Sequence, residues 1–275
     1  MTPGAQPDPS PGLSLQREGH VLVATLNRPD VRNVLDIPLR NALGRMVEEV
    51  RDDASVKALL LTGAGGNFCA GGDLRSLSAQ RRSAAENRQR FMRMQWWMRD
   101  LIQLEKPVVA AVDGAAYGGG FCLALAADFV LASPRAKFCM SFAKLGMVPD
   151  LSALHLLPRM VGLARAKDIV FTGRAVPADE ARSLGLVYEI VPSEQLLASA
   201  MALARRISRA SAIALGQAKV LLTQAFEISQ RAAADFEVGA EAVCIDSDFH
   251  HEAVRRFLAK EPPLFDWERP DPDVR

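Results

Sequence analysis

The chain has 275 residues, of which 49% are hydrophobic, so it can bury a large core as one domain or two. Its 33 basic and 32 acidic residues nearly cancel, which argues against a nucleic-acid-binding or membrane-surface protein. The four cysteines form no CxxC pair, and the first residues lack the pattern of a signal peptide, so we expect a reduced cytoplasmic protein.

The first predicted elements are a tail, two strands and a helix between them. Residues 1–12 are rich in Pro and Gly and predict a disordered tail. Residues 21–26 form a β-rich run that ends at a turn signal. Asp36 is the expected N-cap of an amphipathic helix over 37–52, and residues 57–62 read as a short buried strand.

Strands and helices continue to alternate through the middle of the chain. A helix is predicted over 83–104 and a buried strand over 107–112, followed by a glycine turn, an apolar helix and a strand over 129–132. This apolar stretch has the length of a membrane span, but Asp113 and Asp128 lie inside it and charge is costly in a bilayer. We therefore expect no membrane segment here, and the alternation predicts an α/β fold.

The character of the sequence changes after Pro192. Residues 194–261 show helical patterns rich in Ala, Leu and Arg, without a strand signal. We therefore predict a core over 13–200 and a helical C-terminal region over 201–275, which packs on the core or on a neighbouring subunit in an oligomer.

A glycine-rich loop follows the predicted strand 57–62. Phe68 stands where the dinucleotide-binding fingerprint needs its third glycine, and no lysine follows as a P-loop requires. What remains is FCAGGDL, residues 68–74, whose small residues let the backbone approach a ligand. An ordinary tight turn explains this segment equally well when it stands alone.

A second glycine-rich segment, DGAAYGGGF, occupies residues 113–121 after another buried strand. Its glycines place free backbone N–H groups at the start of an apolar helix, where anions are stabilised. Close packing of helix on strand is the structural alternative. Because two such segments occur, we favour a pair of N–H groups that converge on one oxygen, which is an oxyanion hole.

The order and spacing of several motifs resemble the crotonase (enoyl-CoA hydratase/isomerase) superfamily over about residues 13–262. The resemblance implies a spiral of ββα units with a helical C-terminal region, assembled as a homotrimer or a dimer of trimers. It also implies an acyl-CoA thioester substrate and no separate cofactor. The matching motifs are NRPDVRNVL from Asn27, FCAGGDL, AAVDGAAYGGG from Ala110, AKF from Ala136, the TGR to VP stretch at 172–192, and FLAK from Phe257.

The resemblance assigns site residues position by position. It implies that the N–H groups of Gly72 and Gly119 bind the thioester oxygen. It also implies residues that reach the CoA, namely Ala70, Leu74, Phe257 and Lys260, the last two often toward a neighbouring subunit's CoA. Arg28 and Arg32 lie in the loop that borders the CoA entrance, where a cation could pair with phosphate. A solvated surface arginine is an equally good interpretation of each.

The acid and base residues depart from the usual hydratase pattern. Cys122 and Phe142 stand at the two positions that carry glutamates in hydratases. Asp150 instead matches the catalytic aspartate of dienoyl-CoA isomerases, 4-chlorobenzoyl-CoA dehalogenase and ring-1,2-epoxyphenylacetyl-CoA isomerase, and the surrounding motif resembles the last of these especially. We therefore predict an isomerase, within fatty acid metabolism or phenylacetate catabolism, with Asp150 as acid and base.

Asp150 could also act as a nucleophile, as in the dehalogenase branch, although the 85–98 helix has no histidine to serve as its general base. Three further alternatives stay open at this point. Asp150 follows a proline and precedes an apolar helix, so it could serve as an N-cap. The protein could be a hydratase with non-standard residues, or a catalytically silent acyl-CoA-binding member of the family. The four histidines show no metal-ligand spacing, so we expect no metal site.

Overall fold

The computed structural model describes residues 12–79 and 81–268 of the chain. The predicted tail lies outside these residues except for Gly12, and so do the last seven residues of the predicted C-terminal region. The strands are β1 (Leu13–Glu18), β2 (Val21–Leu26), β3 (Ala58–Gly63), β4 (Val108–Val112), β5 (Ala115–Tyr117), β6 (Phe129–Ala132), β7 (Lys137–Cys139), β8 (Ala175–Pro177) and β9 (Glu189–Ile190).

The helices alternate with these strands and then follow them. They are α1 (Ile37–Asp52), α2 (Leu74–Ser78), α3 (Ala84–Ile102), α4 (Gly119–Leu125), α5 (Ala153–Val161), α6 (Leu163–Thr172), α7 (Ala178–Ser183), α8 (Leu196–Ser208), α9 (Ala212–Gln224), α10 (Gln230–Ile245) and α11 (Asp248–Leu258), with 3-10 turns η1 (Pro29–Val31) and η2 (Ser141–Leu145).

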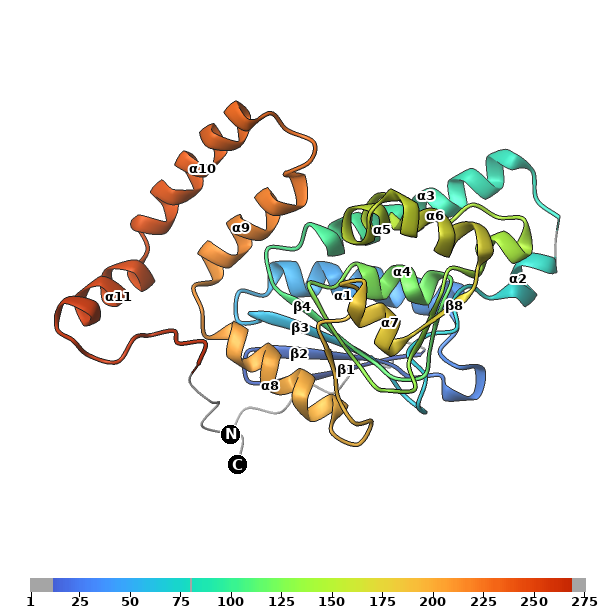
Figure 1. The fold of residues 1–275 in the computed structure, drawn as a ribbon, viewed down its shortest axis with the longest axis horizontal. Coiled ribbons are helices and arrows are strands. Elements are labelled where there is room, and N and C mark those ends of the chain that lie inside the picture. Colours follow the sequence, from blue (N-terminus) through green and yellow to red (C-terminus); the bar gives the residue numbers. More distant parts are fainter. Residues whose placement is uncertain (1–11, 80, 269–275) are drawn as a thin grey trace.

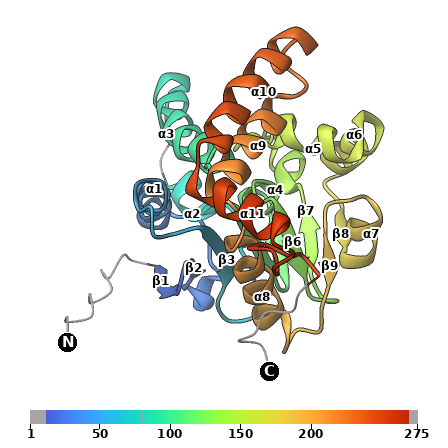
Figure 2. The same ribbon diagram turned by 90° about the vertical axis from the view of Figure 1, so that its left-hand side faces the viewer.

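The larger sheet is a central layer with helices on both faces (Figures 1 and 2). Its strand order is β1-β2-β3-β4-β6-β9, and all neighbours except β1 and β2 run parallel. Alternate residues of one strand face opposite layers: Leu59 and Leu61 pack toward α1, α3 and α4, whereas Leu60 packs toward α8. Burial on both faces explains why the inner strands β2, β3 and β4 are apolar runs, whereas the edge strands β1 and β9 are not.

The smaller sheet gives the fold its spiral. It has the order β5-β7-β8, and Cys69 extends it through a single bridge to Ala116. The chain runs from β4 in the large sheet to β5 in the small sheet and then into α4, and from β6 to β7 and then into η2 and α5. Each turn thus contributes one strand to each sheet and then helix, which is the predicted ββα spiral.

The C-terminal helices are arranged in two ways. Helix α8 packs on the large sheet through Ala200, Ala204 and Ile207, so the predicted boundary at residue 200 falls inside one packed helix. Helices α9, α10 and α11 extend away from this core at one end of the molecule (Figure 1). Along 12–79 and 81–268, every helix is too short or too polar to traverse a bilayer.

The strong sequence patterns located their elements closely. The predicted helix over 37–52 is α1, the predicted strand over 129–132 is β6, and Asp36 caps α1 by accepting from Leu39 N at 3.0 Å. Strand β1 and the short strands β5, β7 and β8 were not predicted. Three residues are too few for a periodic pattern, and only pairing in the folded chain defines such strands.

Candidate active site

The register of the small sheet brings the two glycine-rich segments together. Cys69 pairs with Ala116, and Ala116 pairs with Phe138, all in parallel. Three residues after each of these positions lie Gly72, Gly119 and Ser141, and all three line one pocket. Because paired parallel strands advance together, equivalent positions in successive turns of the spiral end side by side.

Backbone hydrogen bonds hold these two segments in close contact. Cys69 N donates to Ala115 O at 2.8 Å, and Tyr117 N donates to Cys69 O at 2.9 Å. Glycine is required here, because a Cβ on Gly71 would lie 2.5 Å from Tyr117 O, and Gly71 has a φ of +92°. The glycines therefore permit an approach of the two backbones that any other residue would prevent.

The N–H groups of Gly72 and Gly119 remain available at this junction. Gly119 is the first residue of α4, so its N–H has no partner within the helix. Within the described part of the chain, neither N–H donates a hydrogen bond to the protein. Both residues line the pocket, which therefore contains two free backbone donors.

Asn33 holds the first glycine segment in place. Its side chain is fully buried and donates to Ala64 O at 2.9 Å and Asn67 O at 2.7 Å, while its oxygen accepts from Arg28 N at 2.8 Å. The NRP motif contained this residue, but sequence reasoning gave it no role. Its buried amide satisfies backbone groups that would otherwise be left without partners.

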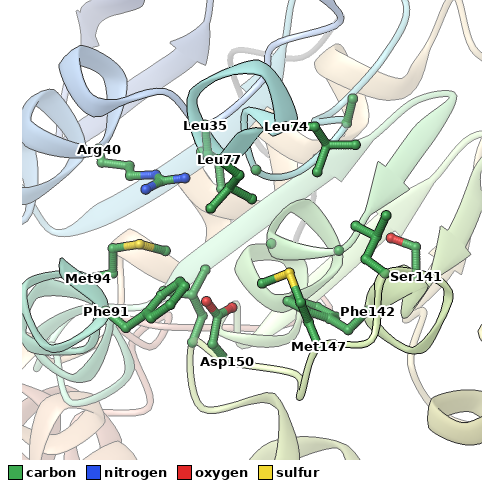
Figure 3. A pocket seen from close by; sticks show the side chains of 16 residues that line it. Leu35, Arg40, Leu74, Leu77, Phe91, Met94, Ser141, Phe142, Met147 and Asp150 are labelled. Carbon is green, nitrogen blue, oxygen red and sulfur yellow. The ribbon is translucent and has the colours of Figure 1, made fainter. Parts of the chain in front are cut away.

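Asp150 lies in the pocket opposite Leu77 and Arg40, with Phe91 and Met147 on either side (Figure 3). Burial raises the pKa of its carboxyl group to about 6, although the charge of Arg40 opposes this rise. The N-cap interpretation is wrong, because Ser152, in the left-handed region, precedes α5 as its N-cap. The carboxylate is therefore free to face the pocket.

Cys122 and Phe142, which occupy the two positions that lack glutamates, are both buried. Cys122 lies inside α4, and burial, followed by the nearby charge of Asp150, raises the pKa of its thiol well above the usual range. A protonated, enclosed thiol cannot activate water. Phe142 contributes an apolar wall to the pocket. Asp150 is thus the one carboxylate among the described residues that line this pocket.

Sequence reasoning missed Arg40, which also lines the pocket. It lies on α1 and is only 7% exposed, although it is charged. Its guanidinium approaches the first glycine segment, since Arg40 Nη2 lies 3.6 Å from the position of a Cβ on Gly72. One signal was present: Arg40 falls on the same helical stripe as Leu43, Val47 and Val50, where an apolar residue is expected.

The predicted CoA-contacting residues are only partly brought together. Ala70 and Leu74 line the pocket. Arg28 forms an ion pair with Asp36, and Arg32 is exposed while its carbonyl accepts from Ala70 N at 2.9 Å, so both lie beside the first glycine segment. The two other residues predicted to contact CoA, Phe257 and Lys260, lie far from the first glycine segment.

Those two residues do not reach the pocket of their own chain. Phe257 belongs to α11, which lies at the opposite end of the molecule from α2 (Figure 1). Phe257 is 83% exposed, and Lys260 is exposed too. Within residues 12–79 and 81–268, the His, Cys, Asp and Glu side chains form no group of three that could hold a metal ion.

The fold and the pocket together define a class of enzyme: a ββα spiral whose pocket is lined by two free backbone donors and, among the described residues, by one partly buried carboxylate. Residues 16–269 match the family model described as Enoyl-CoA hydratase/isomerase. The chain belongs to this family, and it is an enzyme of the crotonase superfamily.

Individual relatives agree with this assignment. The chain is 35% identical to 1,2-epoxyphenylacetyl-CoA isomerase of Escherichia coli K12, over 90% of this chain and 95% of the relative. It is 32% identical to the short-chain-enoyl-CoA hydratase of Clostridium acetobutylicum, over 90% and 94%. The crystal structure of an enoyl-CoA hydratase/isomerase from Cupriavidus metallidurans CH34 matches with a TM-score of 0.89 and 37% identity, over 98% of this chain and 100% of that one.

Proposed function

We propose that this enzyme moves the double bond of an enoyl-CoA thioester, with Asp150 as the acid and base. The observation that carries the proposal is the arrangement of one carboxylate, with a pKa of about 6, in the same pocket as the N–H groups of Gly72 and Gly119. A base of this strength is mostly ionised at neutral pH and still binds a proton well.

The chemistry needs only these groups. Asp150 removes the α-proton of a 3-enoyl-CoA, and the electrons move into a dienolate whose negative charge rests on the thioester oxygen. The N–H groups of Gly72 and Gly119 stabilise that oxygen. The protonated Asp150 then returns the proton to the γ-carbon, which gives the conjugated 2-enoyl-CoA. The CoA is part of the substrate, so no separate cofactor takes part.

The remaining site residues bind the CoA portion in this proposal. Ala70 and Leu74 contact it at the pocket, and Arg28 and Arg32 border its entrance. Phe257 and Lys260 serve a neighbouring subunit, since they lie too far from the pocket of their own chain. This last role requires an oligomer, and a homotrimer or a dimer of trimers fits it. Four cysteines without a disulfide suit a cytoplasmic enzyme.

The test compares wild type with Asp150→Asn on a 3-enoyl-CoA, measured by the absorbance of the conjugated product. We expect the variant to lose roughly a hundred- to ten-thousand-fold in kcat, because proton transfer is removed. Asp179→Asn is the matched control, since Asp179 is exposed on α7 and makes the same change in charge. Equal rates for Asp150→Asn and wild type would refute the role of Asp150.

Two alternatives are separated by the same assay. Several relatives are named as hydratases, and a hydratase would remove the absorbance of crotonyl-CoA. We expect no such loss, because Cys122 and Phe142 cannot activate water. A catalytically silent member would instead show saturable acyl-CoA binding without turnover of any 3-enoyl-CoA.

A further inference from the structure

A second cavity lies beside the active-site pocket, between α1 and α3. The two share Arg40 and Met94 as lining residues. Arginine is unusually frequent in the second cavity, which is lined by Arg40, Arg90 and Arg93 together with Glu86 as its one carboxylate. The acyl pocket thus borders a strongly cationic cavity.

Two of the guanidinium groups in this cavity have buried nitrogen atoms without a hydrogen-bond partner. Arg40 is 7% exposed, and its Nε is buried without a hydrogen-bond acceptor. Nε and Nη1 of Arg90 are also buried without a hydrogen-bond acceptor, while its Nη2 donates to Ser76 Oγ at 3.4 Å. Native proteins normally pair a buried arginine with an acceptor or a counter-charge. These three nitrogen atoms are therefore exceptions that call for a ligand.

No carboxylate among the described residues forms an ion pair with Arg40 or Arg90, although the charges of Asp150, Asp36 and Asp73 act to raise the pKa of Arg40, and that of Asp73 the pKa of Arg90. Glu86 is engaged in the capping box of α3, where it accepts from Ser83 N at 2.8 Å and Ser83 Oγ at 2.7 Å. Asp150 faces Arg40 across the pocket, but the two form no ion pair within 4.0 Å. Burial and the neighbouring charge of Arg90 both lower the pKa of Arg40, so the two cations repel each other. An anion between them would relieve this repulsion.

We propose that the acyl group of the substrate carries a carboxylate at its far end, and that Arg40 and Arg90 bind this carboxylate. The inference rests on the proposed function, since it assumes an acyl-CoA in the pocket. Arginine presents a planar fork of donors that matches a carboxylate. Arg40 stands where the acyl pocket meets the cationic cavity, so a short acyl chain entering past Gly72 would direct its end there.

The experiment measures binding without catalysis. Isothermal titration compares saturated thioesters in matched pairs of equal chain length: butyryl- with succinyl-CoA, valeryl- with glutaryl-CoA, and hexanoyl- with adipyl-CoA. We expect at least one dicarboxylic member to bind roughly tenfold to a hundredfold more tightly than its partner, as charge-assisted hydrogen bonds predict. Free adipate serves as a separate arm, and weak binding of it shows that the thioester carries the anion into the site.

Variants assign that preference to the two arginines. Arg40→Met keeps an unbranched, flexible side chain but removes the guanidinium charge, and we expect it to abolish the preference. Arg90→Gln should reduce it severalfold, whereas Arg88→Gln, on the exposed part of α3, should leave it intact. Hexanoyl-CoA affinity in each variant shows that the pocket is still folded.

The outcomes separate this inference from the proposed reaction. Equal affinity within all three pairs would overturn it, as would a preference that survives in Arg40→Met. Loss of hexanoyl- and adipyl-CoA affinity by the same factor in Arg40→Met would also overturn it, because Arg40 would then act at the thioester. Isomerase activity enters none of these measurements, so a preference for dicarboxylic thioesters can stand even if Asp150 proves unnecessary.

Discussion

Two regions of this chain bury their apolar side chains to very different extents. In the region up to the end of α8, the strands and the inner faces of α1 and α8 are almost completely enclosed. Helices α9, α10 and α11 keep a single buried residue between them, Gly216. Large apolar side chains are exposed along these helices and the loop between α9 and α10, namely Ile213, Leu222, Phe226, Phe236, Val238, Val243, Ile245, Val254, Phe257 and Leu258.

The difference shows which region holds the buried core. The residues that line the acyl pocket all lie in the core, and its central strands are buried within one chain. The core also exposes large apolar side chains, among them Val148, Leu163 and Phe171. The C-terminal helices are joined to it by few contacts, such as the ion pair of Lys219 with Asp128 at 2.7 Å. Exposed apolar side chains gathered in one part of a protein surface mark an interaction site. The second region therefore suits the proposed oligomer, and the following experiments test the contrast between the two regions.

The largest effect on stability is expected in the core. Phe138 is fully buried and packs on Phe121 with ring centroids 5.3 Å apart. Phe138→Ala should lower the free energy of unfolding by about 3–5 kcal/mol in urea denaturation, because it leaves a cavity. The matched variant is Phe236→Ala on α10, where the side chain is 53% exposed. Its effect should grow with protein concentration if its burial is intermolecular. If both variants lose the same free energy of unfolding at every protein concentration, Phe236 is buried within its own chain and the two regions do not differ in this respect.

The next effect concerns assembly. Val238 and Leu258 are 72% and 75% exposed, on α10 and α11. Val238→Asp combined with Leu258→Asp should place uncompensated charges in the proposed interface and reduce the sedimenting mass to that of one chain. Val148→Asp is the control, because Val148 is 71% exposed but lies in the core region. A mass unchanged by the double variant would exclude this surface as the interface.

A smaller effect is expected from pH on catalysis, and it arises from Asp150 in the core. Asp150 must be ionised to act as a base, and its pKa is about 6. The value of kcat/KM should therefore be level above pH 7 and fall about tenfold for each pH unit below 6. The effect of pH on stability runs the other way. The folded state raises the pKa of Asp150 to about 6 from the ordinary value of 3.8, so it binds this proton more tightly than the unfolded state does. The contribution of Asp150 to the free energy of unfolding therefore becomes more favourable as pH falls from above 6 toward 4.

The matching measurement uses pH-rate profiles of wild type and of the Val238→Asp, Leu258→Asp variant. The residues that line the acyl pocket around Asp150 all come from one chain, so the apparent pKa should be the same for both even if CoA binding weakens. A shift of that pKa in the dissociated variant would show that the pocket depends on the neighbouring subunit.

The smallest effect is expected at a helix cap. Ser229 begins α10 and accepts from Ala232 N at 3.2 Å. Ser229→Ala should cost about 1 kcal/mol of local helix stability. Hydrogen exchange should then accelerate in α10 but not in β3 or β4. Uniform acceleration throughout the chain would show that the core and the C-terminal helices unfold as one unit.

The sequence predicted the long elements well because their signals are local. Helix α1 combines an N-cap at Asp36 with an apolar stripe, and both features lie within the helix itself. The C-terminal helices likewise each begin at a serine cap, Ser211, Ser229 or Ser247. The motifs around Gly72, Gly119 and Asp150 could also be placed, since each is a continuous stretch of sequence.

Only the tertiary structure decided how these stretches meet. The pairing of Cys69 with Ala116 joins residues far apart in the chain, and it alone places Gly72 beside Gly119. The pKa of Asp150 depends on burial by residues from several elements, and so does the unpartnered state of Arg40. Capping and periodicity act over a few neighbouring residues, whereas burial and strand register are properties of the whole fold. For that reason the sequence determined the family and the candidate catalytic residues by motif, and the folded chain determined their environment.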